Sequence, residues 1–495
     1  MQSQVLWALV LLGVSGIDGF HAHRVLHTRR HVVPSMVAVG PAAAPSSAVD
    51  PLPIVRPQLS GLEGKALAPD FLDNVPSKAA VRAVVPSHCY TRQTWRSLAY
   101  LAQSVITTAL TASLGLLIPL KLAALPLWLL YAAVTGTTAM GMWVLAHECG
   151  HGAFSDNRLL QDAVGFVLHS LLLVPYFSWQ RSHAVHHART NHIYEGETHV
   201  PTVVDGRDGH ETPGGAEMMN IAKNMGERRH GFYQLFGHLT VRHAASLPLS
   251  SLPPCLVPPI YPFLLRFAPP VEGQRHSGRV SRSQIGWPSY ILAGLTGGSK
   301  YGTSNHFWPF RPLNSASAQR HMWPNKWPTK VLQSSAGVAA VLVGLAMWAR
   351  RAGAATVWAL YGGPYLVVNM WLIVYTWLQH TDVDVPHLGA SEFTYMRGSF
   401  HTIDRPYPPL IDRLHHRIGS THVAHHIDCT IPHYHAREAT DAIAKAFPKV
   451  YLHEPTPVHI ALWRVACHCI AVKRRSADDQ RYVFVPLHSW RSSPK

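Results

Sequence analysis

The chain has few charged residues, and acidic residues are the scarcest of them. Asp and Glu together number 27 among 495 residues, against 43 Lys and Arg, so the formal net charge is +16. The basic residues are scattered, without a basic helix or a stripe in which they alternate with aromatic residues, so the charge does not indicate nucleic-acid binding. It better suits an anionic lipid surface or an acidic electron-transfer partner.

Cysteine is also scarce. The six cysteines form neither a disulfide framework nor a zinc-type Cys-x-x-Cys pair, which argues against a small disulfide-stapled domain and a zinc ribbon. We therefore expect buried or idle thiols at Cys89, Cys149, Cys255, Cys429, Cys467 and Cys469.

Histidine, by contrast, is abundant and clustered. Three clusters stand out: His147-Glu-Cys-Gly-His151, His183-Ala-Val-His186-His187 and His422-Val-Ala-His425-His426. Residues three or four positions apart share a helix face, so each cluster can direct two or three imidazoles at one point. Imidazole is a ligand for zinc, iron, copper and nickel, and the pattern therefore predicts a metal without naming it.

Chance must be weighed, because the chain contains 34 histidines. Random placement gives roughly two His-x-x-x-His matches in such a chain, but only about 0.16 His-x-x-His-His matches. The second and third clusters, with three histidines each, are therefore informative. The first cluster, with two histidines, is significant only because it occurs together with them. Eight imidazoles exceed what one ion takes, which predicts a site for two metals.

Apolar segments long enough to cross a membrane lie beside these clusters. A fifth apolar stretch, residues 163–177, is too short and ends near Pro175, so we expect a re-entrant or interfacial helix there. Residues 247–267 are interrupted by several prolines and are rejected as a lipid-exposed span. The predicted spans are residues 98–120, 127–146, 335–348 and 354–378, the third of which needs flanking residues to reach full length.

Four spans arranged as two hairpins place all three clusters on one side of the membrane, because an even number of crossings separates them. Arg350 and Arg351 then fall on the opposite side, which runs mildly against the positive-inside tendency. The predicted fold class is an all-α membrane protein with a helical cap that carries the histidine-rich site.

The chain divides into four predicted regions: an N-terminal targeting leader (1–49), a linker (50–85), a membrane domain (86–466) and a C-terminal tail (467–495). Residues 5–17 form an apolar run of signal-peptide length, and no acidic residue occurs between Asp18 and Asp50. This signal followed by a transit-like stretch resembles the bipartite leaders of algae with complex plastids, so a plastid membrane is favoured. An endoplasmic reticulum signal or a disordered N-terminus is the alternative.

The ligand types narrow the chemistry. A mononuclear zinc hydrolase needs three protein ligands and an open position, which eight imidazoles exceed. Imidazole-rich ligation beside lipid favours iron that activates O2 and attacks a hydrocarbon in a dry cavity. Glu148 points off the face of His147 and is expected either to support the site by hydrogen bonding or to have no role.

The three clusters, their order and the hydrophobic layout resemble the membrane-bound fatty acyl desaturases, in particular the acyl-lipid Δ12/ω3 group. The resemblance covers roughly residues 84–451. Further matching stretches are Pro86-Ser-His-Cys-Tyr-Thr-Arg, Gly286-Trp-Pro-Ser-Tyr290, Leu378-Gln-His-Thr-Asp382, Thr402-Ile-Asp-Arg-Pro-Tyr407 and Ile431-Pro-His-Tyr-His-Ala-Arg-Glu-Ala-Thr440.

The resemblance implies an enzyme that removes two hydrogens from adjacent methylenes of a membrane lipid acyl chain, with O2 as co-substrate and two non-haem iron ions as cofactor. It also implies a ninth ligand near the end of the fourth span, for which His380 is the candidate. The implied ligands are His147, His151, His183, His186, His187, His422, His425, His426 and His380. We expect polar surface or supporting roles for His192, His199, His306, His415, His416, His433 and His435.

The regiochemistry is less sharply indicated. His-Glu-Cys-Gly-His and Thr421-His-Val-Ala-His-His426 favour Δ12 (ω6) desaturation of oleate to linoleate, whereas Gly152 and Ile431-Pro-His-Tyr favour ω3. A related di-iron hydroxylase, epoxygenase or acetylenase is a further alternative, and a metal transporter a remote one. The sequence has no His-Pro-Gly-Gly haem motif, so the electrons are expected from a separate ferredoxin or cytochrome b5.

Overall fold

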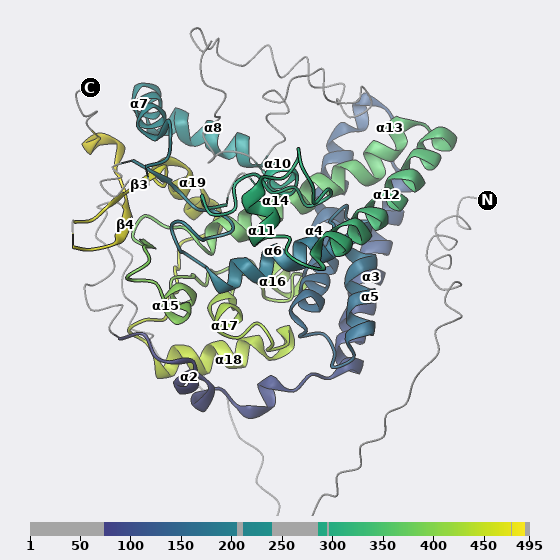
Figure 1. Ribbon diagram of the computed structural model, residues 1–495. Coiled ribbons are helices and arrows are strands. Elements are labelled where there is room, and N and C mark those ends of the chain that lie inside the picture. Colours follow the sequence, from purple (N-terminus) through teal and green to yellow (C-terminus); the bar gives the residue numbers. More distant parts are fainter. Residues whose placement is uncertain (1–73, 205–210, 240–285, 295–296, 477, 491–495) are drawn as a thin grey trace, which may run out of the picture. The chain divides into compact units, whose positions relative to one another are not determined.

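The computed structural model describes residues 74–204, 211–239, 286–294, 297–476 and 478–490 (Figure 1). The predicted leader (1–49), the rejected span (247–267) and Cys255 lie outside these residues. Of the predicted linker (50–85), the described end forms α2 (Lys78–Val84), whose first turn is capped by Ser77. The described residues all belong to one compact unit, Pro53–Lys495.

Among the described residues, four helical segments are each long and apolar enough to cross a membrane, which confirms the four predicted spans. A bent pair of helices within residues 158–188 would be a fifth only if the two helices count as one broken span. Many of their large apolar side chains are exposed, including Leu110, Leu129 and Val343, as expected of residues that face lipid. The segments are α3 (Thr94–Leu114), α4 (Leu125–His151), α12 (Trp327–Ala352) and the run from α13 (Ala354–Val357) through a π-helical turn (Trp358–Gly362) to α14 (Gly363–Leu378).

The helix ends differ from the prediction at two places. Helix α4 continues past residue 146 to His151, so the first histidine cluster forms the last turn of the span and does not follow it. It stops at Gly152, whose φ of 76° suits glycine. Helix α12 has 26 residues, because polar residues at both ends extend the short apolar run to full length.

The fifth apolar stretch is divided between two helices that meet at a sharp bend. Helices α5 (Arg158–Leu171) and α6 (Tyr176–Ala188) are bent by 103° relative to each other, with Pro175 immediately before α6. Proline disfavours helical backbone in the residue before it, which explains the break. The bend turns α6 and its three histidines towards the end of α4.

The remaining described helices are short. A small four-stranded sheet, which the all-α prediction did not anticipate, has the order β1-β3-β4-β2; β1 and β3 are parallel and the other pairs antiparallel. The helices are α7 (Gly215–Met225), α8 (Glu227–Leu239), α10 (Trp287–Ala293), α11 (Ala316–His321), α15 (Tyr395–Phe400), α16 (Pro409–Leu414), α17 (His422–Ile427), α18 (His433–Ala446) and α19 (Val458–His468). The strands are β1 (Thr202–Val203), β2 (His387–Leu388), β3 (Ala471–Arg474) and β4 (Arg481–Phe484).

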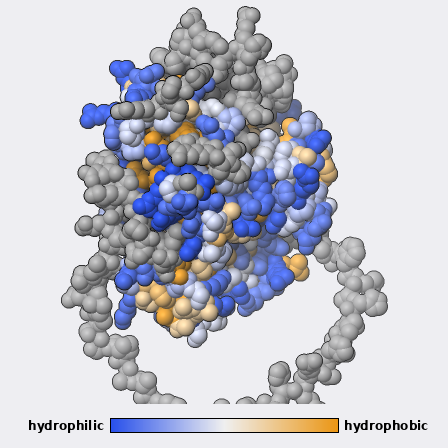
Figure 2. Space-filling model, turned by 60° about the vertical axis from the view of Figure 1, so that its left-hand side comes forward, coloured by the Kyte–Doolittle hydropathy of each residue, from blue (hydrophilic) through white to orange (hydrophobic). Residues whose placement is uncertain are grey.

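The segment predicted as a C-terminal tail, 467–495, begins within α19 and supplies both β3 and β4. Its described part is therefore paired with β1 and β2. The face that contains this sheet is turned forward in Figure 2 and has more hydrophilic than hydrophobic surface among the described residues.

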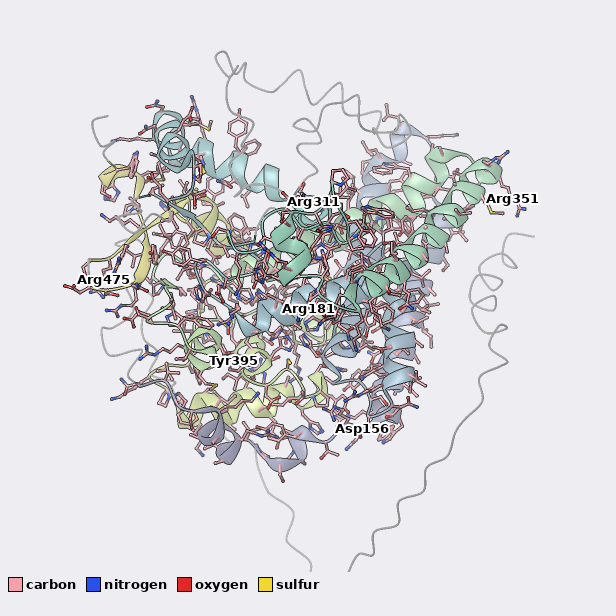
Figure 3. All side chains as sticks on the ribbon, in the orientation of Figure 1. Asp156, Arg181, Arg311, Arg351, Tyr395 and Arg475 are labelled. Atoms are coloured by element: carbon pink, nitrogen blue, oxygen red, sulfur yellow. The ribbon has the colours of Figure 1, made fainter. Side chains whose placement is uncertain are left out.

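The two ends of the spans have different surroundings. Figure 3 shows Arg351 at the end of α12 that leads into α13, far from Tyr395 on α15. The hydroxyl of Tyr395 donates to the backbone oxygen of His426 at 2.7 Å, which ties α15 to the third histidine cluster. The arginine pair therefore lies at the far end from that cluster, as the two-hairpin topology predicts.

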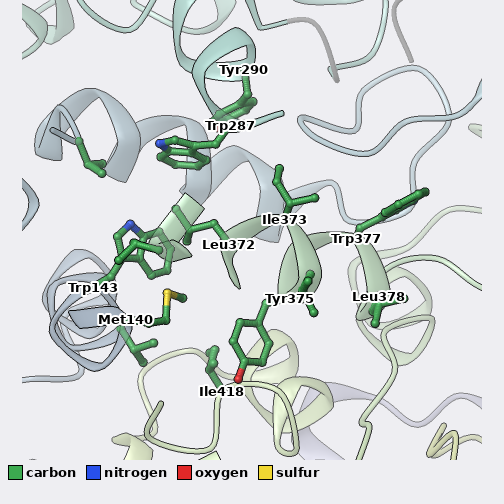
Figure 4. Packing of buried hydrophobic residues seen from close by; sticks show 14 of the residues in the cluster. Met140, Trp143, Trp287, Tyr290, Leu372, Ile373, Tyr375, Trp377, Leu378 and Ile418 are labelled. Carbon is green, nitrogen blue, oxygen red and sulfur yellow. The ribbon is translucent and has the colours of Figure 1, made fainter. Parts of the chain in front are cut away.

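The largest apolar core joins α4, α6, α10 and α14 (Figure 4). Trp143, Trp179, Trp287 and Leu372 are among its buried side chains. Close helix contact is possible at Gly136, where an added Cβ would lie 2.5 Å from the backbone oxygen of Pro364. This packing holds the second and fourth spans together directly beside the histidine clusters.

Candidate metal centre

Each histidine cluster lies on a helix, the first two at helix C-termini. His147 and His151 occupy the last turn of α4, and the second cluster occupies the last two turns of α6. The third cluster, His422 to His426, lies within the six-residue helix α17. Because each spacing is three or four residues, the imidazoles of one cluster share a face.

Five imidazoles form the first group. His147, His151, His183, His187 and His425 each place one ring nitrogen within 4.8 Å of the others. The Nε2 atoms of His147 and His151 are 3.1 Å apart, and those of His183 and His187 are 3.2 Å apart. All three clusters therefore contribute to one point.

Four imidazoles form the second group. One ring nitrogen each of His186, His380 and His426 lies within 4.8 Å of the others. His422 joins them, with its Nε2 3.0 Å from Nε2 of His380, which is also 3.1 Å from Nε2 of His186. His380 follows the fourth span, so a residue outside the three clusters completes this group.

The two groups are neighbours. The rings of His187, from the first group, and His426, from the second, are stacked at 9° with centroids 4.1 Å apart. All nine predicted site residues thus converge in two adjacent sets. Such an arrangement suits two metal ions side by side, each with imidazole ligands.

The donor atoms present fit a pair of metals. Nε2 of His425 and Nε2 of His426 are buried without a hydrogen-bond partner among the described residues, one in each group. A buried ring nitrogen left unpaired is costly unless something else satisfies it, and a cation would do so. Thr190 Oγ1 lies 3.1 Å from Nδ1 of His426, which orients that ring so that Nε2 faces the group.

Burial keeps the imidazoles outside the spans neutral. It lowers the pKa of His380, His422, His425 and His426 well below the usual range, and the neighbouring histidines act in the same direction. Metals bind neutral imidazole, so these rings are in the ligating form at physiological pH.

Two tryptophans at the edge of the apolar core pack against the first group. Trp143 stacks on His147 with ring centroids 5.6 Å apart, and Trp179 stacks on His183 at 4.5 Å. Trp143 also meets the edge of Trp287, and both tryptophans belong to the core shown in Figure 4. The centre therefore lies against a buried apolar region, and a low-dielectric surrounding strengthens electrostatic interactions.

Glu148 supports the site through the backbone. Its Oε2 accepts a hydrogen bond from the N–H of His433 at 3.0 Å, and the side chain is buried. This bond connects the end of α4 with the start of α18. Of the two predicted roles for Glu148, the supporting one is what the structure shows.

A buried charge network fixes the segment that carries His380. Arg405 is fully buried and donates to Asp382 at 2.8 Å, to Glu454 at 2.7 Å and to the backbone oxygen of Leu378 at 2.8 Å. Arg464 contacts the same Asp382 oxygen at 2.6 Å. Burial opposes the charge of Asp382, but the two guanidinium groups outweigh it and lower the pKa of this carboxyl.

Asp404 fixes the third cluster in a similar way. Its Oδ1 accepts from the N–H of Val423 at 2.9 Å, and its Oδ2 accepts from the hydroxyl of Tyr451 at 2.8 Å. Burial raises the pKa of Asp404 to about 6, against the effect of these two hydrogen bonds. Asp404 belongs to Thr402-Ile-Asp-Arg-Pro-Tyr407, a stretch that the sequence analysis matched to the family without assigning a role to any of its residues. The structure shows that one of its residues holds the third cluster in place.

The remaining histidines lie outside both groups. Of the seven for which surface or supporting roles were expected, six are buried and His199 is partly exposed. Polar partners compensate for burial at two of them: Nδ1 of His415 is 2.7 Å from the hydroxyl of Tyr375, and Nε2 of His416 is 3.0 Å from Ser104 Oγ. The expectation of a surface position was therefore wrong for these six, and a supporting role stays a prediction.

The sequence is similar to known proteins over most of its length. The family model described as "Fatty acid desaturase" matches residues 122–212 and 270–456. A Δ12-fatty-acid desaturase of Vernicia fordii is 33% identical over 430 residues, which cover 85% of this chain and 95% of that protein. A Δ12-fatty-acid desaturase of Arabidopsis thaliana is 32% identical, covering 82% and 89%. An omega-6 fatty acid desaturase of Glycine max, named as an endoplasmic reticulum isozyme, is 32% identical, covering 90% and 96%.

Proposed function

Because the chain belongs to the fatty acid desaturase family, we propose that it introduces a cis double bond at the Δ12 position of a membrane lipid acyl chain, converting oleate to linoleate. The class of enzyme, an oxidoreductase acting within a membrane, follows from family membership and the four spans. The Δ12 position is supported by the names of several relatives and by the form of the first and third clusters.

The observation that carries the proposal is the convergence of nine imidazoles in two adjacent groups. We propose that these groups hold two non-haem iron ions, with His147, His151, His183, His187 and His425 around one and His186, His380, His422 and His426 around the other. When bound, the iron pair would supply the O2 activation that C–H cleavage requires.

The protein's own residues perform the remaining tasks. Trp143 and Trp179 shield the centre on the side of the apolar core, which suits an acyl chain better than a polar substrate. Glu148, Asp404 and Arg405 hold the histidine-bearing segments in register. Such support restricts the positions of the histidine-bearing segments, which favours a site of fixed geometry.

A second regiochemistry has its own support. The stretch Ile431-Pro-His-Tyr resembles ω3 members, and in the structure its His433 begins α18 and bonds to Glu148 beside the centre. An ω3 desaturase would act on linoleate, and a hydroxylase or epoxygenase would leave oxygen in the product. Product analysis separates all of these outcomes.

The decisive test is expression in a host that makes oleate but no polyunsaturated fatty acids, followed by location of new double bonds by mass spectrometry. We expect linoleate from the wild-type chain and none from His186→Ala. His459→Ala is the matched control, because His459 is exposed on α19 and outside both groups. Unchanged acyl chains, with protein and electron donor both present, would contradict the proposal.

The membrane and the electron donor belong to the same proposal. The acid-poor leader supports a plastid membrane with ferredoxin as donor, while relatives named for the endoplasmic reticulum support that membrane with cytochrome b5. We favour the plastid because the leader belongs to this chain. A fluorescent reporter fused to residues 1–50 tests this: accumulation in the endoplasmic reticulum would contradict it.

A further inference from the structure

A second cluster of metal-ligating side chains lies apart from the nine histidines. It consists of His88, Cys89, His435 and Glu438, each of which offers one ligand atom within 4.8 Å of the others. Two of the four are buried and two are exposed. Nothing in the proposed desaturation uses this cluster.

Two segments distant in sequence form the cluster. His88 and Cys89 lie in a short 3-10 turn (Ser87–Tyr90) that precedes the first span. His435 and Glu438 are three residues apart on α18, so they share a face of that helix. Both segments belong to stretches that the sequence singled out, Pro86-Ser-His-Cys-Tyr-Thr-Arg and Ile431-Pro-His-Tyr-His-Ala-Arg-Glu-Ala-Thr440.

The contacts within the cluster leave one ring nitrogen unsatisfied. Nε2 of His88 lies 2.8 Å from Oε2 of Glu438 and 3.8 Å from Sγ of Cys89. The rings of His88 and His435 meet edge to face with centroids 5.3 Å apart. Nε2 of His435 is buried and has no hydrogen-bond partner within the part of the chain that the structure describes, while the side chain is only 8% exposed.

A hydrogen-bonded network explains only part of this arrangement. It accounts for His88 and Glu438, which are about half exposed, and for the thiol of Cys89, which is hydrogen-bonded to Glu438. It leaves Nε2 of His435 buried without a partner among the described residues. A cation held by one nitrogen of His435 and by the other three side chains would give all four groups a common partner.

The donor set indicates which cation. One thiolate, two imidazoles and one carboxylate match the ligands of Zn²⁺, which favours four-coordinate tetrahedral geometry. Bonds of about 2.0–2.3 Å place tetrahedral ligands roughly 3.3–3.8 Å apart. The most widely spaced atoms, up to 4.8 Å apart, therefore need to draw in by up to about 1 Å, whereas Nε2 of His88 and Oε2 of Glu438, 2.8 Å apart, need to separate by about 0.5 Å. The two exposed side chains can make these adjustments, and the same exposure lets the ion enter.

We propose that His88, Cys89, His435 and Glu438 form a zinc site, separate from the histidine centre, that clamps the segment before the first span to α18. The clamp spans 350 residues of sequence. Helix α18 begins at His433, which is bonded to Glu148 at the end of the first cluster's helix. Zinc at this position stabilises the folded protein by bridging segments that are far apart in the unfolded chain.

The test uses the purified full-length protein in detergent, with Co²⁺ alone and Zn²⁺ alone as probes. A cobalt ion with a cysteine ligand shows a thiolate charge-transfer band that histidine-bound cobalt does not. We expect this band in the wild-type chain and in Cys429→Ser, which removes a thiol outside the cluster. Cys89→Ser should abolish the band, and zinc measured by mass spectrometry should fall by one ion per chain.

Glu438→Gln keeps the test valid if Cys89→Ser does not fold, because Glu438 is exposed. We expect zinc affinity to fall about tenfold or more in Glu438→Gln and in His435→Asn. We also expect added zinc to raise the thermal unfolding midpoint of the wild-type chain and of Cys429→Ser, but not that of Cys89→Ser.

Absence of the band in the wild-type chain would overturn the proposal, as would its persistence in Cys89→Ser. Equal zinc affinity in the wild-type chain and in Glu438→Gln would overturn it as well. These readouts do not depend on desaturation, so the zinc site and the proposed function can fail separately.

Discussion

The Glu148 side chain accepts a hydrogen bond from the backbone N–H of His433, with 3.0 Å between Oε2 and N. The two residues are 285 positions apart. The bond joins the helix that ends in the first histidine cluster to the helix that follows the third. Because α18 follows α17, which supplies His425 to the first group, the bond restricts the position of the third cluster relative to the first.

Removal of this acceptor is expected to destabilise the centre. Glu148→Ala leaves the N–H of His433 buried without an acceptor, which costs about 1–3 kcal/mol of folding stability. Glu148→Gln keeps an oxygen at the same position and should lose much less. Thermal unfolding and linoleate yield in the oleate-producing host would check this; equal losses in the two variants would contradict the role of the hydrogen bond.

His380 tests the second group by itself. Because its Nε2 lies 3.0 Å from that of His422 and 3.1 Å from that of His186, His380→Asn should remove about one of the two proposed irons and abolish linoleate formation. His416→Asn is the control, since His416 is buried but belongs to neither group. Iron content per purified chain is the measurement. Two irons retained in His380→Asn would rule out His380 as a ligand.

The Asp382 ion pairs predict a pH dependence of stability. Arg405 and Arg464 lower the pKa of Asp382 below its ordinary value of 3.8. A carboxyl with a depressed folded-state pKa contributes stability that is present above the unfolded pKa and is lost as pH falls through the folded pKa. Asp382→Asn should therefore cost about 3–5 kcal/mol at neutral pH, because the buried guanidinium of Arg405 and the partly buried guanidinium of Arg464 lose a partner.

The difference in unfolding midpoint between the wild-type chain and Asp382→Asn should be constant between about pH 6 and pH 8 and should shrink below about pH 4. Asp441→Asn is the matched control, because Asp441 is largely exposed and its ion pair is with Arg437 on the same helix, α18. A difference that grew on acidification would contradict the assignment of the effect to Asp382.

Close contact between the second and fourth spans predicts that alanine destabilises the protein at Gly136, within this contact, but not at Gly344, outside it. At Gly136 a Cβ would lie 2.5 Å from the Pro364 oxygen, so Gly136→Ala must separate α4 from α14 and should cost about 1–3 kcal/mol. At Gly344 on α12, no atom of the described residues lies within 4 Å of the added Cβ. Gly344→Ala should be neutral or stabilising by up to about 1 kcal/mol.

Thermal unfolding in detergent would distinguish the two glycines. Gly136→Ala should also reduce linoleate yield, because α4 and the run that ends in α14 position histidines at their ends. Equal stability of Gly136→Ala and Gly344→Ala would show that this close approach is unimportant.

Local spacing allowed the metal centre to be anticipated. Two or three histidines at intervals of three and four share a helix face wherever that helix lies, so each cluster was predictable as a ligand set. Runs of apolar residues likewise determine spans, because the bilayer thickness sets the length of a crossing helix. Together with an even number of crossings, these local rules predict that all three clusters meet.

The partition of the ligands and their supports depended on the tertiary structure. His425 and His426 are adjacent in sequence and belong to different groups, because neighbouring residues on a helix point about 100° apart and the packing of α17 decides what each one faces. The roles of Asp404 and Arg405, and the meeting of Cys89 with His435, depend on contacts between residues tens to hundreds of positions apart. No periodicity encodes such contacts; they exist only once the helices have packed.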